Sequence, residues 1–181
     1  MIFVFPTIVA SLIVLAQAQK LVLVGTQEPT CKPHYADISS ISATAPRYWQ
    51  TTFRNDDTVS RLSVVASYGV AEIGQASGIA VSNCADGQML VRYFTWGNDA
   101  DFEVPCNQGQ EMTVTVFHDR QTVELNANGV KYGQKVLPLM PHTMTSKNFC
   151  IGSDTNGEQR FFGVVHSAVV FSGPAASITA P

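Results

Sequence analysis

Hydrophobic and polar residues alternate along much of the chain, most regularly between residues 111 and 136. Successive side chains of a β-strand point to opposite faces, so a period of two predicts strands that are buried on one side. The alternation covers residues 112–117 and 122–127, and a third segment follows Asn128-Gly129. Both of these residues tolerate the positive φ angles of a two-residue hairpin turn. Three consecutive antiparallel strands are therefore predicted here.

Shorter segments of the same kind follow one another along the rest of the chain, separated by turn residues. They predict strands at 20–24, 48–54, 62–68, 79–81, 89–96, 100–106, 149–152 and 161–171, the first of them at a sheet edge. Neither a long helix nor an internal repeat is indicated. About a dozen short strands with frequent turns are typical of a sandwich of two antiparallel sheets. We expect a single all-β domain.

The two ends of the sequence differ from this domain. Residues 1–18 contain a short apolar run that ends at Ala16-Gln17-Ala18, a pattern typical of a cleaved signal peptide. The run is short for a spanning helix, so we expect secretion and no membrane anchor. The sandwich domain is expected at 19–172, followed by a flexible tail at 173–181. The length suits one domain with a sizeable core.

Secretion changes the meaning of the cysteines, because an oxidising compartment favours disulfides. The four cysteines of the chain allow three pairings. We favour Cys84–Cys106, which would join neighbouring strands, and Cys31–Cys150, which would join the first and last thirds of the chain. The lack of C-x-x-C spacing argues against a zinc site. We expect a sandwich that is stapled by disulfides.

Charge and histidine content argue against several functions. The formal net charge is −3 over 181 residues, so nucleic acid is not an expected partner. The histidines, His34, His118, His142 and His166, are isolated in the sequence and are expected at the surface or in turns rather than as ligands or bases. Residues 154–158 offer oxygens to calcium, but the simpler interpretation is an Asx turn. We expect neither a cofactor nor a metal site.

The segment from Met89 to Trp96 is apolar on both faces, which indicates a central strand or the wall of a cavity. Arg92 lies within it and needs a carboxylate partner or a ligand if its face is buried. If that face is open, Arg92 and Trp96 form a platform for a planar or sugar-like group. The sequence leaves both alternatives open. The candidate ligand-binding residues are Trp49, Arg92, Tyr93, Trp96, Asp99 and Asp101.

Turn and packing residues of the last third of the chain form a further pattern. One strand ends in Asn128-Gly129, a later strand carries Ile151-Gly152, and the last strand contains Phe161, Gly163, Val165 and Phe171. This pattern resembles the end of the concanavalin A-like and laminin-G-like jelly rolls, although His166 stands where that family often has an acidic residue. The resemblance implies a jelly-roll fold, and it implies no particular activity.

Three acidic residues, Asp99, Asp101 and Glu103, alternate on one strand face. They resemble the E-x-D-x-E strand of laminarinase-type glycosidases. Retaining hydrolysis needs two carboxyl groups about 5–5.5 Å apart. Residues i and i+4 of a flat strand lie about 13 Å apart, so the preferred interpretation is a solvated acidic face.

Three functions fit these observations. The first is a secreted lectin-like protein that binds a glycan or another extracellular small ligand near Arg92, Trp96 and Asp99. The alternative is an enzyme of secondary metabolism, similar in size and style to hetero-Diels–Alderases, in which an apolar pocket orients an apolar small molecule without a cofactor. That pocket would be lined by Trp49, Tyr68, Tyr93, Phe94 and Trp96. The third is a structural protein that acts by association, for example as a homodimer.

Overall fold

The computed structural model describes residues 19–26, 30–33, 45–70, 72, 75–95, 97–139, 143–144 and 148–172, with the backbone alone at 19–26, 30–33, 148 and 171. The expected signal peptide (1–18), the expected tail (173–181), His34, His142 and Trp96 lie outside these residues. Within the described part, no helix has the length and apolar character that a membrane crossing requires.

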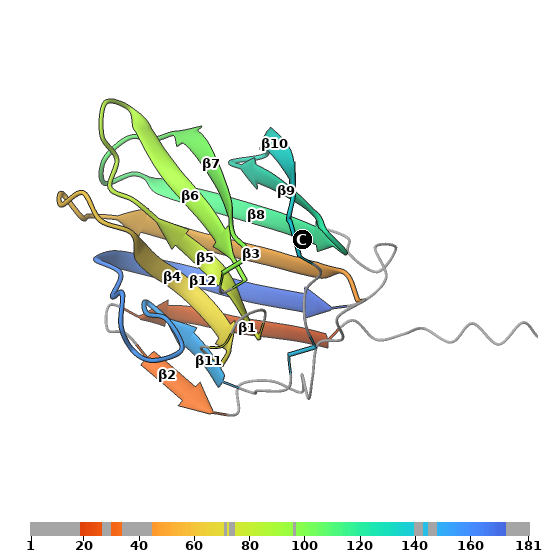
Figure 1. Ribbon diagram of the computed structural model, residues 1–181. Coiled ribbons are helices and arrows are strands. Elements are labelled where there is room, and N and C mark those ends of the chain that lie inside the picture. Colours follow the sequence, from red (N-terminus) through yellow and green to blue (C-terminus); the bar gives the residue numbers. More distant parts are fainter. Residues whose placement is uncertain are drawn as a thin grey trace, which may run out of the picture.

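Twelve strands make up the described domain, and they form two sheets. They are β1 (Gln19–Thr26), β2 (Thr30–Pro33), β3 (Arg47–Asn55), β4 (Ser63–Gly69), β5 (Ala76–Val81), β6 (Gln88–Phe94), β7 (Ala100–Pro105), β8 (Glu111–Asp119), β9 (Thr122–Ala127), β10 (Val130–Val136), β11 (Asn148–Ile151) and β12 (Gly163–Ser172). Sheet A has the order β1-β12-β3-β8-β9-β10, and sheet B has the order β2-β11-β4-β5-β6-β7. All paired strands are antiparallel. Figure 1 shows the two sheets as two layers, which confirms the predicted sandwich.

The predicted meander consists of β8, β9 and β10, which are consecutive neighbours in sheet A. Asn128 and Gly129 connect β9 to β10 with φ angles of 48° and 78°, as a two-residue type I′ turn requires. A bulge between Lys131 and Gly133 interrupts the pairing of β10 with β9. β10 forms one edge of sheet A, and β1 forms the other edge, as predicted.

The core fills the space between the two sheets. In β3 every second residue is buried, so the strand presents one face to the core and the other face outward. Trp49 and Phe53 of β3 belong to the same core cluster as Tyr68 of β4 and Tyr93 of β6. β4 and β5 differ from β3, because all of their residues are buried. The central strands of sheet B are therefore covered on their outer side as well.

Disulfides fasten sheet B at two places. Cys84 and Cys106 are bonded, as predicted, and join the segment before β6 to the residue after β7. Cys150 of β11 is also disulfide-bonded. Its register partner on β2 is Cys31, in agreement with the second predicted pair.

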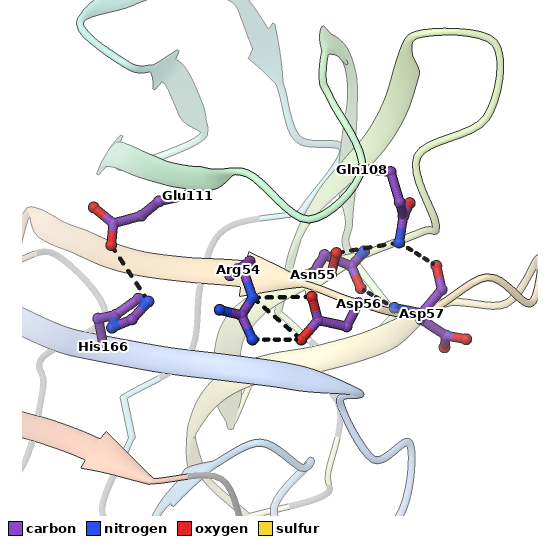
Figure 2. A network of polar contacts seen from close by, with 7 residues as sticks. All are labelled: Arg54, Asn55, Asp56, Asp57, Gln108, Glu111 and His166. Carbon is purple, nitrogen blue, oxygen red and sulfur yellow. Dashed lines mark hydrogen bonds and ion pairs between the residues drawn. The ribbon is translucent and has the colours of Figure 1, made fainter.

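A polar network closes one end of the sandwich (Figure 2). The backbone N–H of Asp57 donates to Oδ1 of Asn55 at 3.0 Å, and Gln108 Nε2 donates to the carbonyls of both residues at 3.3 Å. The connection between β7 and β8 is thereby held against the end of β3. Beside it, Arg54 forms an exposed two-bond pair with Asp56, in which Nε and Nη2 each donate at 2.9 Å.

Candidate functional site

A pocket lies on the outer face of sheet B, the face that points away from the core. Val91 and Tyr93 of β6 belong to the core cluster, so Arg92 between them points outward. The strand registers place Arg92 directly opposite Ala80 on β5 and opposite Asp101 on β7. These three residues therefore form a row across the outer face. The pocket encloses about 210 Å³ and is lined by Leu62, Ala80, Arg92, Phe94, Gly97, Asp99, Asp154 and Gln159.

The floor of this pocket is apolar. Val64, Ala80 and Phe94 form a small cluster separate from the main core, and Leu62 packs against it. Gly78 is the register partner of Phe94, and a Cβ atom at position 78 would lie 2.6 Å from Cζ of Phe94. Glycine is thus required for the phenyl ring to lie on β5. Val64, Ala80 and Phe94 are themselves nearly buried, so the apolar surface that a ligand can reach here is mainly that of the partly exposed Leu62.

The polar wall of the pocket is built around Arg92. Its Nε donates to Oδ1 of Asp101 at 2.6 Å, and its Nη2 donates to Oδ2 at 2.8 Å. Nη1 lies 3.7 Å from Oδ2 of Asp99. The hydrogen bonds to Arg92 lower the pKa of Asp101, and those to Asp101 raise the pKa of Arg92. About a third of each side chain is exposed, at 32% for Arg92 and 36% for Asp101. The guanidinium is fixed in direction and remains accessible from the pocket.

Two further carboxylates are positioned by backbone groups. The N–H of Thr95 donates to Oδ1 of Asp99 at 3.2 Å. Oδ1 of Asp154 accepts from the N–H groups of Asn156 and Glu158 at 3.0 and 2.7 Å, which confirms the predicted Asx turn. Among the residues that the structure describes, no group of three His, Cys, Asp or Glu side chains could hold a metal ion. The carboxylates are therefore considered as hydrogen-bond acceptors.

The charge of the site is negative. The carboxylates of Asp99 and Asp101 flank the guanidinium of Arg92, and a third, nearly buried carboxylate, that of Asp154, lines the same pocket. Arg92 already makes two hydrogen bonds to Asp101, so it offers little net positive potential to an anion. Positioned acceptors, an oriented donor and an apolar floor suit an uncharged molecule with several hydroxyl groups.

The structure divides the predicted ligand-binding residues into two groups. Arg92, Asp99 and Asp101 lie together at the pocket. Trp49 and Tyr93 lie in the core with no exposed surface, so they cannot contact a ligand on this face. Trp49 stacks on Phe149 with a centroid distance of 5.9 Å and donates from Nε1 to Ser77 Oγ at 3.3 Å.

The prediction of a surface or turn position was wrong for His118. It is only 1% exposed and lies beneath β6. Its Nε2 lies 2.7 Å from the carbonyl oxygen of Arg120 and carries the proton, because a carbonyl can only accept. Nδ1 therefore accepts from the hydroxyl of Tyr93 at 3.0 Å. Burial and the nearby charge of Arg47 lower the pKa of His118 to about 4, so the ring is neutral at pH 7.

The aromatic residues proposed for an enzyme pocket are mostly part of the packed core. Trp49, Tyr68 and Tyr93 are fully buried in the same core cluster. Phe94 alone, among the described members of that set, lines the outer pocket. The described residues therefore give no support to an apolar reaction chamber between the sheets.

No protein-family model and no curated protein matches the sequence. The CBM40 of the Ruminococcus gnavus IT-sialidase, bound to α2,3-sialyllactose, matches with a TM-score of 0.62 and 12% identity over 83% of this chain and 90% of its own. The chain folds as a concanavalin A-like jelly roll.

Two other solved structures support the same fold. A heptameric SAP-like pentraxin from Limulus polyphemus matches with a TM-score of 0.59 and 13% identity, over 82% of this chain and 73% of its own. Domain 4 of AbnA, an extracellular arabinanase of Geobacillus stearothermophilus in complex with arabinotriose, matches with a TM-score of 0.52 and 11% identity, over 85% and 82%. The jelly-roll resemblance thus extends well beyond the last third of the sequence, on which it was first based.

Several pocket residues were not among the sequence candidates. Leu62, Ala80 and Gln159 carry no chemical pattern of their own, and Asp154 was noted only as a turn residue. Phe94 was considered only as a residue of the enzyme pocket. The sequence did contain one signal for Phe94, the isolated glycine at position 78, because a glycine inside a strand often marks the close approach of another group. The structure shows that Gly78 pairs with Phe94 on the neighbouring strand.

Proposed function

We propose that the protein is a secreted lectin-like protein that binds an uncharged glycan in the pocket on the outer face of sheet B. The observation that carries the proposal is the Arg92–Asp101 pair, fixed at 2.6 and 2.8 Å beside the apolar cluster around Phe94. A sugar ring has an apolar CH face and a rim of hydroxyls, and the pocket offers a partner to each. The glycan ligands in the structures of CBM40 and AbnA domain 4 support the same class of ligand.

Each part of the pocket has a role in this proposal. The CH face of the sugar packs on the partly exposed side chain of Leu62, which packs against the buried Phe94 cluster, and this contact removes apolar surface from water. Sugar hydroxyls donate to the carboxylate of Asp99, and they accept from Nη1 of Arg92. Because Asp101 holds the guanidinium in one direction, little side-chain entropy is lost when the sugar binds.

The charge of the pocket selects against acidic sugars. A carboxylate on the ligand would approach Asp99, Asp101 and Asp154 at close range, and like charges in a partly buried site repel strongly. Arg92 is already charge-paired with Asp101, so the donor that remains on Nη1 offsets little of this repulsion. The preferred ligand is therefore a neutral glycan, although the CBM40 structure contains a sialylated one.

Secretion is part of the same proposal. It rests on the signal-peptide pattern of residues 1–18 and on the Cys84–Cys106 disulfide, which suits an oxidising compartment. Expression of the full chain in a secretory host tests it. An N-terminus at Gln19 in the medium is the expected result, and retention of the whole chain inside the cells would contradict it.

Binding is tested with the purified, oxidised protein on an array of neutral and sialylated glycans, followed by calorimetry with arabinotriose and α2,3-sialyllactose. We expect neutral glycans to bind, and we expect Arg92→Ala to weaken that binding by about tenfold or more. Arg54→Ala is the matched control, because it breaks the same kind of two-bond pair with Asp56 outside the pocket (Figure 2). Binding confined to sialylated glycans, or equal losses in both variants, would overturn the proposal.

A further inference from the structure

The last strands of the two sheets, β7 and β10, lie side by side at the open edge of the sandwich (Figure 1), and a groove follows this edge. It consists of two hollows. One encloses about 510 Å³ between Glu103 of β7 and Gln134 of β10, and the other encloses about 370 Å³ near Gln110 and Asn128. Tyr132 lines both hollows, which places them next to each other along this edge.

The floor of the groove is aromatic. Phe102 of β7 lies under β10, where an added Cβ on Gly133 would be 3.6 Å from its ring and Lys135 Nζ is 5.2 Å from its centroid. Tyr132 is half-buried and packs against the main core. The bulge between Lys131 and Gly133 disturbs the pairing at this point and locally changes the direction of β10. The ring of Tyr132 is thus presented, beside the buried ring of Phe102, at an edge that no further strand of the described domain covers.

The groove is continuous with the pocket on the outer face. Asp101 lines the groove, and it holds Arg92, which lines the pocket. The two residues face each other on neighbouring strands, about 4.8 Å apart. Leu90 and Glu103 form the next outward pair of the same strands and also line the groove. A ligand that leaves the pocket over β7 would therefore enter the groove directly.

We propose that the groove binds the continuation of the same glycan, so that the ligand is a linear, uncharged oligo- or polysaccharide rather than a single terminal sugar. This inference rests on the proposed function of the pocket. Tyr132 supplies a ring for stacking at the junction of the two hollows, and Gln134, Gln110 and Asn128 supply amide donors and acceptors along the path. Apart from Asp101, which is paired with Arg92, the groove carries the carboxylates of Glu103 and Glu111 and the single ammonium of Lys135, so it disfavours acidic polymers as the pocket does.

The test is a length series measured by calorimetry, with arabino-oligosaccharides and cello-oligosaccharides of two to six residues. In the unmodified protein we expect the affinity to rise by about tenfold between the dimer and the hexamer, which corresponds to about 1.4 kcal/mol. Tyr132→Ala should remove this rise and leave the affinity for the dimer unchanged. Tyr132→Phe should keep the rise, because the stacking ring remains.

Tyr48→Ala serves as the control, because it removes another half-buried tyrosine, on β3, that lines neither the pocket nor the groove. Circular dichroism verifies that each variant is folded. An affinity that does not depend on length, or a rise that survives in Tyr132→Ala, would contradict glycan binding in the groove. The proposed binding in the pocket would still stand. If none of the saccharides binds at any length, the proposed function fails, and the extension fails with it.

Discussion

Each side of strand β6 carries a hydrogen-bonded polar side chain, and the two sides differ in what water can reach. On the inner side Tyr93 is fully buried, and its hydroxyl is satisfied by His118 at 3.0 Å. On the outer side Arg92 is equally well paired, with Asp101 at 2.6 Å, yet 32% of its side chain remains exposed. A paired polar group inside a sandwich stabilises one arrangement of the core. The same pairing at a surface leaves donors and acceptors in place for a ligand.

This difference separates stability from binding. Buried polar groups cost free energy unless every one of them is satisfied, so the inner cluster tolerates little change. Surface ion pairs contribute little to stability, because solvent screens them. We therefore expect substitutions on the inner side to lower the free energy of unfolding and substitutions on the outer side to lower the affinity for the glycan.

The largest effect is expected from Trp49→Ala. The substitution leaves a cavity beside Phe149 and removes the indole N–H that donates to Ser77 Oγ. It should therefore lower the free energy of unfolding by about 3–5 kcal/mol. Urea denaturation measures the loss. Tyr48→Ala, at the neighbouring and half-buried position, should cost much less. If the folded fraction of Trp49→Ala binds the glycan as tightly as the unmodified protein, the two sides of the sheet act independently.

The second effect concerns acid stability. The pKa of His118 is about 4 in the folded protein and about 6.5 in an unfolded chain. Above pH 6.5 the ring is neutral in both states and has no effect on stability. Between pH 6.5 and pH 4 only the unfolded chain takes up the proton, so the free energy of unfolding should fall as the pH falls, by at most about 3 kcal/mol.

Urea midpoints measured from pH 7 to pH 4.5 test this expectation. His118→Gln is the control, since it removes the titrating group and should flatten the profile even if the variant is less stable at every pH. The exposed His166 is present in both proteins and cancels from their difference. Parallel profiles for the two proteins would contradict the buried, neutral state of His118.

A third, intermediate effect is expected from Gly78→Ala, because position 78 supports the floor of the pocket. The added Cβ would lie 2.4 Å from the carbonyl oxygen of Ala66 and 2.6 Å from Cζ of Phe94. Relief of these contacts should cost about 1–3 kcal/mol of stability. It should also displace the phenyl ring and weaken glycan binding. Thermal unfolding and calorimetry test the two consequences together, and unchanged values of both would show that Phe94 does not depend on this glycine.

The strands of the fold could be predicted because burial between two sheets imposes a period of two on the sequence. The meander, the turn at Asn128-Gly129, the edge strand β1 and the Cys84–Cys106 bond all follow from local patterns. The same alternation also predicts that His118 is buried, because it lies two residues after the buried Val116 on β8. That signal was missed because the neighbouring charges were interpreted as a turn.

The site could be predicted only in part, since it depends on contacts between distant segments. A strand that is apolar on both faces does not reveal which face is inward, so Tyr93 and Arg92 were placed in the same candidate set. The register of β6 with β7 decides the question, because it sets Arg92 opposite Asp101. Gln159 reaches the pocket because its carbonyl accepts from the N–H of Val64 at 2.8 Å, a contact across 95 positions of sequence that no local pattern indicates.

The smallest effect on stability, and the sharpest on binding, is expected from Asp101→Asn. The lowered pKa of Asp101 means that its pairing with Arg92 stabilises the folded state above the pKa of an unfolded aspartate and is lost as the pH falls through the folded value. Both partners are about one-third exposed, so the loss at pH 7 should stay below about 1 kcal/mol. The affinity for a neutral glycan should nevertheless fall by about tenfold, because Arg92 loses the partner that fixes its direction.

Asp56→Asn is the control for this prediction. It loosens Arg54 in the same way outside the pocket and should leave the affinity unchanged. A stability loss as large as that of Trp49→Ala, with unchanged affinity, would mean that the outer pair is structural and that the two sides of β6 do not differ in function.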